Sequence, residues 1–394
     1  MTQANNGPLS GVTVVDLTQF VLGPYATQIL GDLGADVIKV EEPSGDRQRR
    51  QGKAPNSPTM GPMYLAFGRN KRSVTLDLKG EPGRKALRKL IARADIFIHN
   101  MRPDSLARLG FDYPTVKAVK DDIVYVEAMG YSPEGPYAGR QAFDDLIQAA
   151  SGSFGLEALV DPNAPFRPPA SILADKTCGL YTAIASLAAL RHREATGEGQ
   201  YVCVPMLECF TGYIMAEHLY GETFAPPTGG FGHTMTVTPH RRPMRTKDGW
   251  LMLQPADRNQ AARFMALGGI PDAYESERFV SAPTSKAKVQ VYYDMLHEAA
   301  ATHTTAEWME LTAAHSIPAM AANDARGVLT DPQLAVTLFE WRDLPGEGRY
   351  RAMKPPLRFS KTPSEIRRDP PELGTDNDEV FAEFGIDAED AVAS

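Results

Sequence analysis

Residues 11–41 read GVTVVDLTQFVLGPYATQILGDLGADVIKVE, and this stretch decides the fold class. Residues 11–17 are rich in β-branched side chains, which indicates a buried strand, and residues 35–41 repeat that pattern. Between them a helical pattern begins after Gly23 and ends at Gly34. A strand, a helix and a second strand in this order predict one unit of a parallel sheet with a right-handed crossover.

The same alternation continues along the chain. Further strands are predicted at residues 96–98, 123–126 and 201–204, and further helices at residues 82–94, 175–193 and 205–219. These elements predict an α/β fold built on a parallel sheet. Ligands of such sheets usually bind at the carboxyl ends of the strands, here expected at residues 19–23, 41–43, 100–103 and 129–131.

The character of the sequence changes after about residue 222. Residues 222–246 are rich in Pro and Gly, which indicates a linker or a functional loop. Helical patterns at residues 259–267, 286–301 and 305–313 then predict a smaller domain of the α/β or α+β class. From about residue 326 the chain is rich in Pro and in charge, and it is expected to end in an acidic helix.

Length and composition exclude several classes of protein. A chain of 394 residues with 43% hydrophobic and 23% charged residues is expected to fold into two or three domains rather than to be disordered. Its net charge of −8 argues against binding nucleic acid with the whole surface. Three cysteines without a CxxC spacing predict a reducing compartment. The first residues lack a signal sequence, and no apolar run reaches the ~18 residues of a membrane helix. We therefore expect a cytoplasmic protein that does not bind membranes.

Common cofactor motifs are absent. No GxGxxG follows the first strand, which argues against a dinucleotide cofactor, and neither GxxxxGK[ST] nor GxSxG occurs. His297 and His303 lie six residues apart, so they would project from different faces of a helix. We expect no metal site.

Asp175 follows an apolar segment and opens a predicted helix. Its structural interpretation is an N-cap that accepts hydrogen bonds from the first turn. Its functional interpretation uses the same position, because a helix N-terminus holds a carboxylate in place and such a carboxylate can act as a nucleophile.

Two further features also have two interpretations each. Cations that follow predicted strand ends form either a solvated surface or a phosphate site: Lys71, Arg72, Lys79, Arg102 and Arg108. The glycine-rich segment TGGFGH at residues 228–233 is either a linker or a mobile lid.

In order along the chain, several blocks make this sequence similar to the class III CoA-transferases, the family of formyl-CoA transferase and carnitine CoA-transferase. The blocks are VDLT at 15–18 with GP at 23–24, LGADVIKVE at 33–41, NKRSVTLDLK at 70–79, AD at 94–95 with NMRP at 100–103, GY at 130–131, FD at 143–144 with Gln148 and SG at 151–152, LAD at 173–175, TGEGQ at 196–200 and DGW at 248–250. No single block is specific, whereas their ordered series over nearly the whole chain is highly specific.

The resemblance implies a Rossmann-like large domain that binds CoA, formed by residues 1–222 and 327–394, and a smaller α/β domain with linkers at residues 223–326. It also implies a homodimer whose two chains are interlocked like links. The substrates would be an acyl-CoA and a carboxylic acid. Coenzyme A would be a substrate rather than a permanently bound cofactor.

The resemblance also implies roles for individual residues. Asp175 would be the nucleophile, carrying first a mixed anhydride and then an aspartyl-CoA thioester. The residues placed at CoA and its thioester are Val21, Leu22, Leu76, Lys79, Asn100, Met101, Arg102, Arg108, Gln141, Phe143 and Asp144. Gly229, Gly230 and Gly232 would form an active-site loop.

The sequence indicates the class of the substrates but not their identity. Glu42, Met101 and Gln141 replace cationic residues of the two named family members, which argues against oxalate and carnitine as substrates. A second carboxylate could be bound by Arg140, His233, His240, Arg241 and Arg242. A dicarboxylic acid such as succinate, with succinyl-CoA as donor, is the interpretation that follows.

Three alternatives stay open. An α-methylacyl-CoA racemase of the same fold needs a pair of proton-transferring groups, and Phe143 stands where such enzymes have a histidine. A non-catalytic CoA-binding subunit would not need Asp175. An α/β binding protein without CoA is the third alternative.

Overall fold

The structure, a computed structural model, describes residues 6–387 and falls into two units of the chain. Unit 1 comprises Met1–Leu156, Pro165–Phe231 and Val336–Ser394, and unit 2 comprises Glu157–Ala164 and Gly232–Ala335. Within the described range, no helix is both long and apolar enough to cross a membrane.

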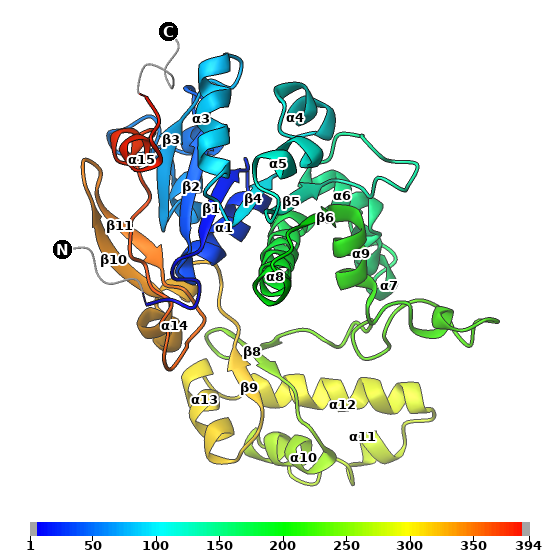
Figure 1. Cartoon of the computed structure of the whole chain (residues 1–394). Coiled ribbons are helices and arrows are strands. Elements are labelled where there is room, and N and C mark those ends of the chain that lie inside the picture. Colours follow the sequence, from blue (N-terminus) through cyan, green and yellow to red (C-terminus); the bar gives the residue numbers. More distant parts are fainter. Residues whose placement is uncertain (1–5, 388–394) are drawn as a thin grey trace. The chain divides into compact units, whose positions relative to one another are not determined.

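A six-stranded parallel sheet forms the centre of unit 1, with the strand order β3-β2-β1-β4-β5-β6 (Figure 1). Its strands are β1 (Thr13–Leu17), β2 (Asp36–Glu41), β3 (Lys71–Thr75), β4 (Ile96–His99), β5 (Val124–Met129) and β6 (Gln200–Pro205). The predicted α/β fold with a parallel sheet is confirmed. The order reverses between β1 and β4, and such a switch point is where open α/β sheets bind ligands.

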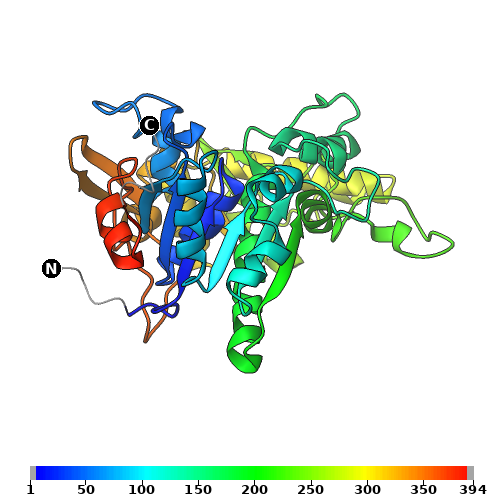
Figure 2. The same ribbon diagram turned by 45° about the horizontal axis from the view of Figure 1, so that its top comes forward.

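Helices cover both faces of this sheet. They are α1 (Leu22–Asp32), α2 (Pro62–Phe67), α3 (Glu81–Ile91), α4 (Pro103–Leu109), α5 (Tyr113–Val119), α6 (Asp144–Ala150), α8 (Leu173–Thr196), α9 (Met206–Met215) and α15 (Asn377–Phe384), with short 3₁₀ helices η1 (Arg47–Arg50), η2 (Ser153–Gly155) and η3 (Tyr220–Thr223). On one face, α3, α5 and α15 share a core that includes Leu87, Val116 and Phe381 (Figures 1 and 2). On the other face, α1 and α8 pack together around Leu30 and Leu190.

The apolar pattern of α8 is only partly used in this packing. Among the apolar residues of this helix, Ala183 and Leu190 are buried, whereas Leu180 and Ile184 are 47% and 62% exposed. The helix prediction is confirmed, but only one edge of its apolar face is packed in this chain, and the edge with Leu180 and Ile184 is exposed.

Strand β3 was not predicted from the sequence, and its position changes the interpretation of two cations. Lys71 and Arg72 begin β3 and are almost fully buried, so assigning them to a segment after a strand end is wrong. Lys71 Nζ lies 3.1 Å from Asp16, and Arg72 forms ion pairs with Asp36 and Glu383. Charged residues interrupt the apolar pattern by which a buried strand is predicted. Here each of the two charges is neutralised by a partner inside the fold.

The end of the chain returns to unit 1. The antiparallel pair β10 (Phe339–Leu344) and β11 (Gly348–Met353) was not predicted, whereas the acidic helix is confirmed as α15. The side chains of Asp376 and Asn377 accept the main-chain N–H groups of Ser73 and Thr75 at 2.7 and 2.9 Å. The returning segment thus satisfies donors of the edge strand β3, which would otherwise be open to other chains.

Unit 2 has its own sheet and core. The antiparallel sheet has the order β7 (Met244–Arg245), β8 (Trp250–Leu253) and β9 (Ala319–Ala321), accompanied by α10 (Arg258–Leu267), α11 (Glu277–Val280), α12 (Ser285–Ala300), α13 (Thr305–Ala314) and the short η4 (Gly327–Leu329). Two short helices, α7 (Leu156–Val160) and α14 (Pro332–Thr337), span the divisions between the units. Phe264 stacks on the buried Trp308 with ring centroids 4.2 Å apart. The three predicted helices are confirmed, and the antiparallel sheet makes this unit α+β.

Candidate active site

The turn from β1 to α1 is built on the buried carboxylate of Asp16. It accepts hydrogen bonds from the hydroxyls of Thr18 and Thr27 at 2.5 and 2.6 Å, and Lys71 Nζ lies 3.1 Å away. Burial alone would raise the pKa of Asp16, but Lys71, Lys39 and the two hydroxyls outweigh burial and lower it to about 2. The VDLT block is therefore a structural anchor with a permanently ionised carboxylate.

This anchor positions the start of α1 beside the loop after β4. Gln19 N–H donates to the side-chain oxygen of Asn100 at 2.8 Å, and the Asn100 amide donates back to Gln19 O at 2.8 Å. Val21 and Leu22 follow directly and are almost fully buried at the N-terminus of α1. Three residues predicted at CoA therefore meet at the switch point of the sheet.

Asp175 lies in the first turn of α8, but it is not the N-cap. The helix begins at Leu173, so its N-cap residue is Ile172, which has no capping side chain. Asp144, the first residue of α6, supplies the missing acceptor, because its Oδ1 accepts the main-chain N–H of Asp175 at 3.0 Å. The N-cap interpretation of Asp175 is wrong, and its own carboxylate is left available.

The carboxylate of Asp175 has an unusual environment. Within residues 6–387, no hydrogen bond or ion pair reaches it, and an apolar cluster that includes Ala174, Cys178 and Ile147 lies beneath the turn. Burial, and then the negative charge of Asp144, raise the pKa of Asp175 to about 7. At neutral pH the group is therefore partly ionised and more basic than an ordinary aspartate.

Two close contacts join the start of α1 to α8 and to the segment before α6. A Cβ atom on Gly179 would lie 2.8 Å from the carbonyl oxygen of Leu22, so only glycine lets α8 approach α1 this closely. Phe143, which precedes α6 and is 57% exposed, packs edge-on against Phe20 with ring centroids 6.4 Å apart. Gln141 is exposed in the same segment.

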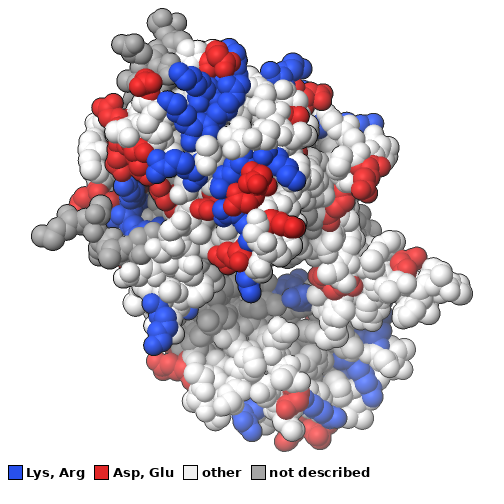
Figure 3. All heavy atoms as spheres, viewed as in Figure 1, with Lys and Arg blue, Asp and Glu red and all other residues white. Residues whose placement is uncertain are grey.

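The cations predicted at CoA phosphates are exposed and unpaired. Lys79 lies between β3 and α3, Arg102 precedes α4, and Arg108 lies in the last turn of α4. In the described part of the chain, no carboxylate forms an ion pair with any of the three, and Arg108 donates only to the Ser105 hydroxyl. By contrast, among the Lys and Arg side chains gathered over α3 in Figure 3, Arg84 and Arg88 pair with Glu81.

Two apolar residues of the predicted CoA set belong to the core instead of the surface. Leu76 is fully buried among the side chains beneath α3 and α5, and Met101 packs against the same cluster from a half-buried position. Leu76 can therefore shape a CoA site only from below.

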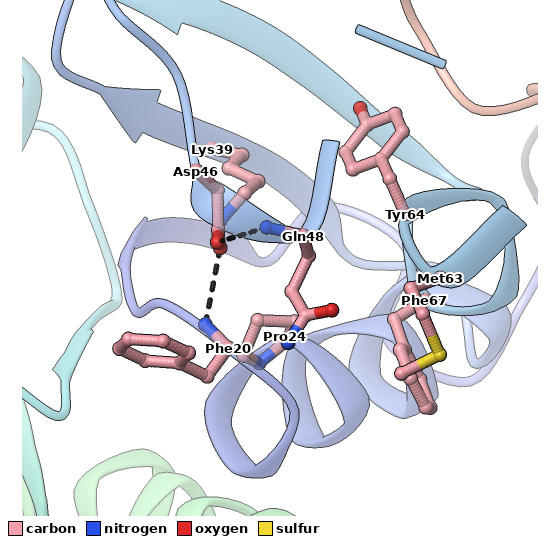
Figure 4. Close-up of a pocket in the computed structure, with 8 residues that line it drawn as sticks. All are labelled: Phe20, Pro24, Lys39, Asp46, Gln48, Met63, Tyr64 and Phe67. Carbon is pink, nitrogen blue, oxygen red and sulfur yellow. Dashed lines mark hydrogen bonds and ion pairs between the residues drawn. The ribbon is translucent and has the colours of Figure 1, made fainter. Parts of the chain in front are cut away.

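A small hollow lies beside the start of α1, and no sequence pattern predicted it (Figure 4). Its lining residues are Phe20, Pro24, Lys39, Asp46, Gln48, Met63, Tyr64 and Phe67. Asp46 accepts the main-chain N–H groups of Phe20 and Gln48 at 3.1 and 3.0 Å. Most of this lining comes from residues 42–70, which carry no periodic pattern. The available signal was Lys39, a charge between the apolar residues Ile38 and Val40 of β2.

The predicted glycine loop is divided between the two units. Gly229 and Gly230 belong to unit 1, where Gly221 N–H donates to Gly230 O at 3.3 Å, and Gly232 begins a stretch of unit 2. Gly232 has a φ of 98°, a conformation that favours glycine.

A metal site and a cysteine thiolate would be two other kinds of reactive centre. Within residues 6–387 there is no group of three His, Cys, Asp or Glu side chains that could hold a metal ion. Burial raises the pKa of Cys178, three residues after Asp175, so its thiol stays protonated.

Known proteins resemble this chain along almost its whole length. Residues 9–377 match the model of CoA-transferase family III. The succinate–glutarate CoA-transferase of Agrobacterium fabrum is 30% identical over 391 residues, which cover 96% of this chain and 96% of that protein. The succinyl-CoA:glutarate CoA-transferase of Homo sapiens is 28% identical over 96% of this chain and 86% of its own. A CAIB/BAIF family protein from Brucella suis has a crystal structure that matches with a TM-score of 0.82 and 28% identity, over 96% of this chain and 100% of that one. The chain therefore belongs to CoA-transferase family III and is an enzyme that transfers coenzyme A.

Proposed function

We propose that this enzyme moves CoA from an acyl-CoA thioester to a carboxylic acid through covalent intermediates on Asp175. The observation that carries the proposal is the half-buried carboxylate of Asp175, which has no partner among residues 6–387 and whose pKa is raised by burial and by Asp144. With a pKa near 7, it is a stronger nucleophile than an ordinary aspartate and is still substantially ionised at neutral pH.

The reaction proceeds in two mirrored halves. The Asp175 carboxylate attacks the thioester carbonyl, which forms a mixed anhydride and releases CoA thiolate. The thiolate then attacks the aspartyl carbonyl, which leaves an aspartyl-CoA thioester and the donor acid. The acceptor carboxylate attacks that thioester, giving a second anhydride and thiolate, and the thiolate takes the acceptor acyl group as the new acyl-CoA. Atoms and charges balance with these two substrates alone, so no permanently bound cofactor is needed.

Asp144 and the start of α8 support these steps. Asp144 fixes the main chain at Asp175 through the 3.0 Å hydrogen bond, which keeps the nucleophile in one position. The positive end of the α8 dipole favours the negative charge that develops on the carbonyl oxygens during each attack.

Unit 1 is proposed as the CoA-binding domain. The unpaired cations Lys79, Arg102 and Arg108 would bind the CoA phosphates, since Arg offers paired donors and Lys a point charge. Val21, Leu22 and Asn100 would line the path of the pantetheine arm, with Met101 beside them and Leu76 beneath. Gln141, Phe143 and Asp144 would lie at the thioester, and Gly229, Gly230 and Gly232 would cover it.

A dicarboxylic acid is the proposed substrate class, with succinyl-CoA as donor. The names of the Agrobacterium and human relatives carry succinate or succinyl-CoA together with glutarate. In this chain, exposed cations such as Arg140 and Arg242 are candidates for binding a second carboxylate.

An interlocked homodimer and a cytoplasmic location complete the proposal. Three large side chains of α8, Leu180, Tyr181 and Ile184, are exposed on a long helix, and a second chain would bury them. Light scattering after gel filtration measures the mass that decides this point. The cysteines are free, as expected in a reducing compartment.

The test is a panel of acyl-CoA donors against carboxylic acid acceptors, read by chromatography of the CoA products. We expect a new acyl-CoA that depends on both substrates. Hydroxylamine added with the donor should convert Asp175 into a hydroxamate that peptide mass spectrometry detects. Transfer without any modification of Asp175 would contradict the covalent route. Deuterium exchange at the α-carbon without an acceptor would instead support the racemase alternative.

A further inference from the structure

Gln148 makes two hydrogen bonds, one to Asp144 and one to the segment just before α8, the helix that carries the candidate nucleophile. It is fully buried in α6, one turn after Asp144. Its Nε2 donates to Oδ2 of Asp144 and, at 3.3 Å, to the carbonyl oxygen of Ser171, which lies just before α8. One side-chain amide therefore joins the start of α6 to the segment that leads into the Asp175 helix.

The orientation of this amide is determined by its neighbours. Both groups that face Nε2 are acceptors, so a reversed amide would place its oxygen against a carboxylate and a carbonyl. In the native orientation, Gln148 Oε1 is buried and has no partner within the described residues. Glutamine thus leaves one buried acceptor unsatisfied, which an apolar residue of similar size would avoid. The two donated hydrogen bonds account for its presence.

The two oxygens of Asp144 have separate tasks. Oδ2 accepts from Gln148, and Oδ1 accepts the main-chain N–H of Asp175. A carboxylate held by one oxygen cannot rotate freely, so the hydrogen bond from Gln148 determines where the other oxygen lies. We propose that Gln148 is a positioning residue, which orients Asp144 so that Asp144 fixes the main chain at Asp175. The catalytic consequence rests on the proposed function, whereas the orientation itself does not.

Hydrogen exchange at the Asp175 amide tests this orientation without any assay of activity. In the full-length protein, Gln148→Met keeps the volume of the side chain but removes both donors. We expect the Asp175 amide to exchange about tenfold faster in Gln148→Met and in Asp144→Ala, since both variants release that N–H. Gln148→Asn, which keeps an amide but is shorter, provides a second variant with an intermediate acceleration.

Gln28→Met is the matched control. Gln28 is also a buried glutamine of unit 1 whose Oε1 has no partner within the described residues, and it lies in α1. We expect no change at the Asp175 amide in this variant. An unchanged rate in Gln148→Met, or an equal acceleration in Gln28→Met, would overturn the proposal.

Kinetics give the catalytic consequence. We expect Gln148→Met to lower kcat about 10–100-fold, as is typical of residues that orient a reacting group, with KM for the acyl-CoA nearly unchanged. Adding Gln148→Met to Asp144→Ala should cost almost nothing further, whereas independent losses that multiply would overturn the pathway through Asp144. If the wild-type enzyme transfers no CoA, the proposed function fails, and the exchange rates still decide the role of Gln148.

Discussion

Two aspartates of unit 1, Asp16 and Asp175, differ in burial and in their partners, since Asp16 is fully buried and Asp175 is half-buried. Asp16 accepts hydrogen bonds from two threonine hydroxyls and a buried lysine, and its pKa falls to about 2. Asp175 has burial and a second carboxylate beside it, and its pKa rises to about 7. The same residue type is thus permanently ionised in one place and near its titration midpoint in the other.

The comparison separates a carboxylate that anchors the fold from the one proposed to react. A carboxylate whose oxygens already accept several short hydrogen bonds has little electron density left for attack and cannot move. A carboxylate that is buried without partners destabilises the fold, and proteins keep such groups mostly where chemistry needs them. The lysines of unit 1 repeat the contrast, since Lys71 is buried against Asp16 and Lys79 is exposed and unpaired.

The largest effect is expected at Asp175. Replacing it by Ala should lower the rate of CoA transfer about 10³-fold or more, because the proposed acyl intermediates form on its carboxylate. The fold should not suffer. Because the pKa of Asp175 is raised on folding, the unfolded chain ionises first, and stability is lost as pH rises from 3.8 to about 7. At pH 8 the variant should therefore unfold in urea no earlier than the wild type.

Asp16 should show the reverse behaviour. Asp16→Asn leaves Lys71 buried without its counter-charge, which should cost about 3–5 kcal/mol in the free energy of unfolding by urea. Because the folded pKa is depressed, the stability from Asp16 is fully present above the ordinary value of 3.8 and is lost as pH falls towards about 2.

A compensating change sharpens this second prediction. Adding Lys71→Met to Asp16→Asn removes the unpaired charge and should restore part of the lost stability. If Asp16→Asn unfolds at the same urea concentration as the wild type, the Asp16 network is not the anchor described above.

The contrast between the two aspartates was only partly readable from sequence. The alternation of strands and helices predicted the parallel sheet, because hydrophobic period and turn residues are local signals. The VDLT block and Asp175 were both singled out, but spacing alone did not separate an N-cap from a nucleophile. That distinction depends on Asp144, 31 residues away, which takes the capping role.

The features that the sequence did not predict, strand β3 and the small hollow, have the same physical origin. β3 was missed because Lys71 and Arg72 appear polar along the chain, and only their partners in β1, β2 and α15 make them suitable for a core. The lining of the hollow at Gln48 and Met63 comes from a segment without period. Local patterns thus identified the elements, whereas the pairing of charges appeared only in three dimensions.

The pH dependence of activity measures the difference between the two aspartates directly. Because attack needs the ionised form of Asp175, kcat/KM should fall about tenfold per pH unit below about 7 and reach a plateau above it. Burial is the larger cause of the raised pKa and Asp144 the second, so Asp144→Asn should move the midpoint to lower pH, on top of any loss of rate. An unchanged midpoint in that variant would mean that the rate reports another group.

The smallest effects are expected at the exposed cations, where water competes with any ligand. Lys79→Ala, Arg102→Ala and Arg108→Ala should each raise KM for the acyl-CoA about 3–10-fold and leave kcat unchanged, because a phosphate contact is made equally in the ground and transition states. Arg84→Ala is the matched control, since Arg84 is a nearby cation that Glu81 already neutralises. The losses should shrink in high salt, which screens exposed charges. If Arg84→Ala raises KM as much as Lys79→Ala, the absence of an ion-pair partner does not identify the cations that bind CoA. A missing partner would then indicate a functional role for carboxylates such as Asp175 but not for cations.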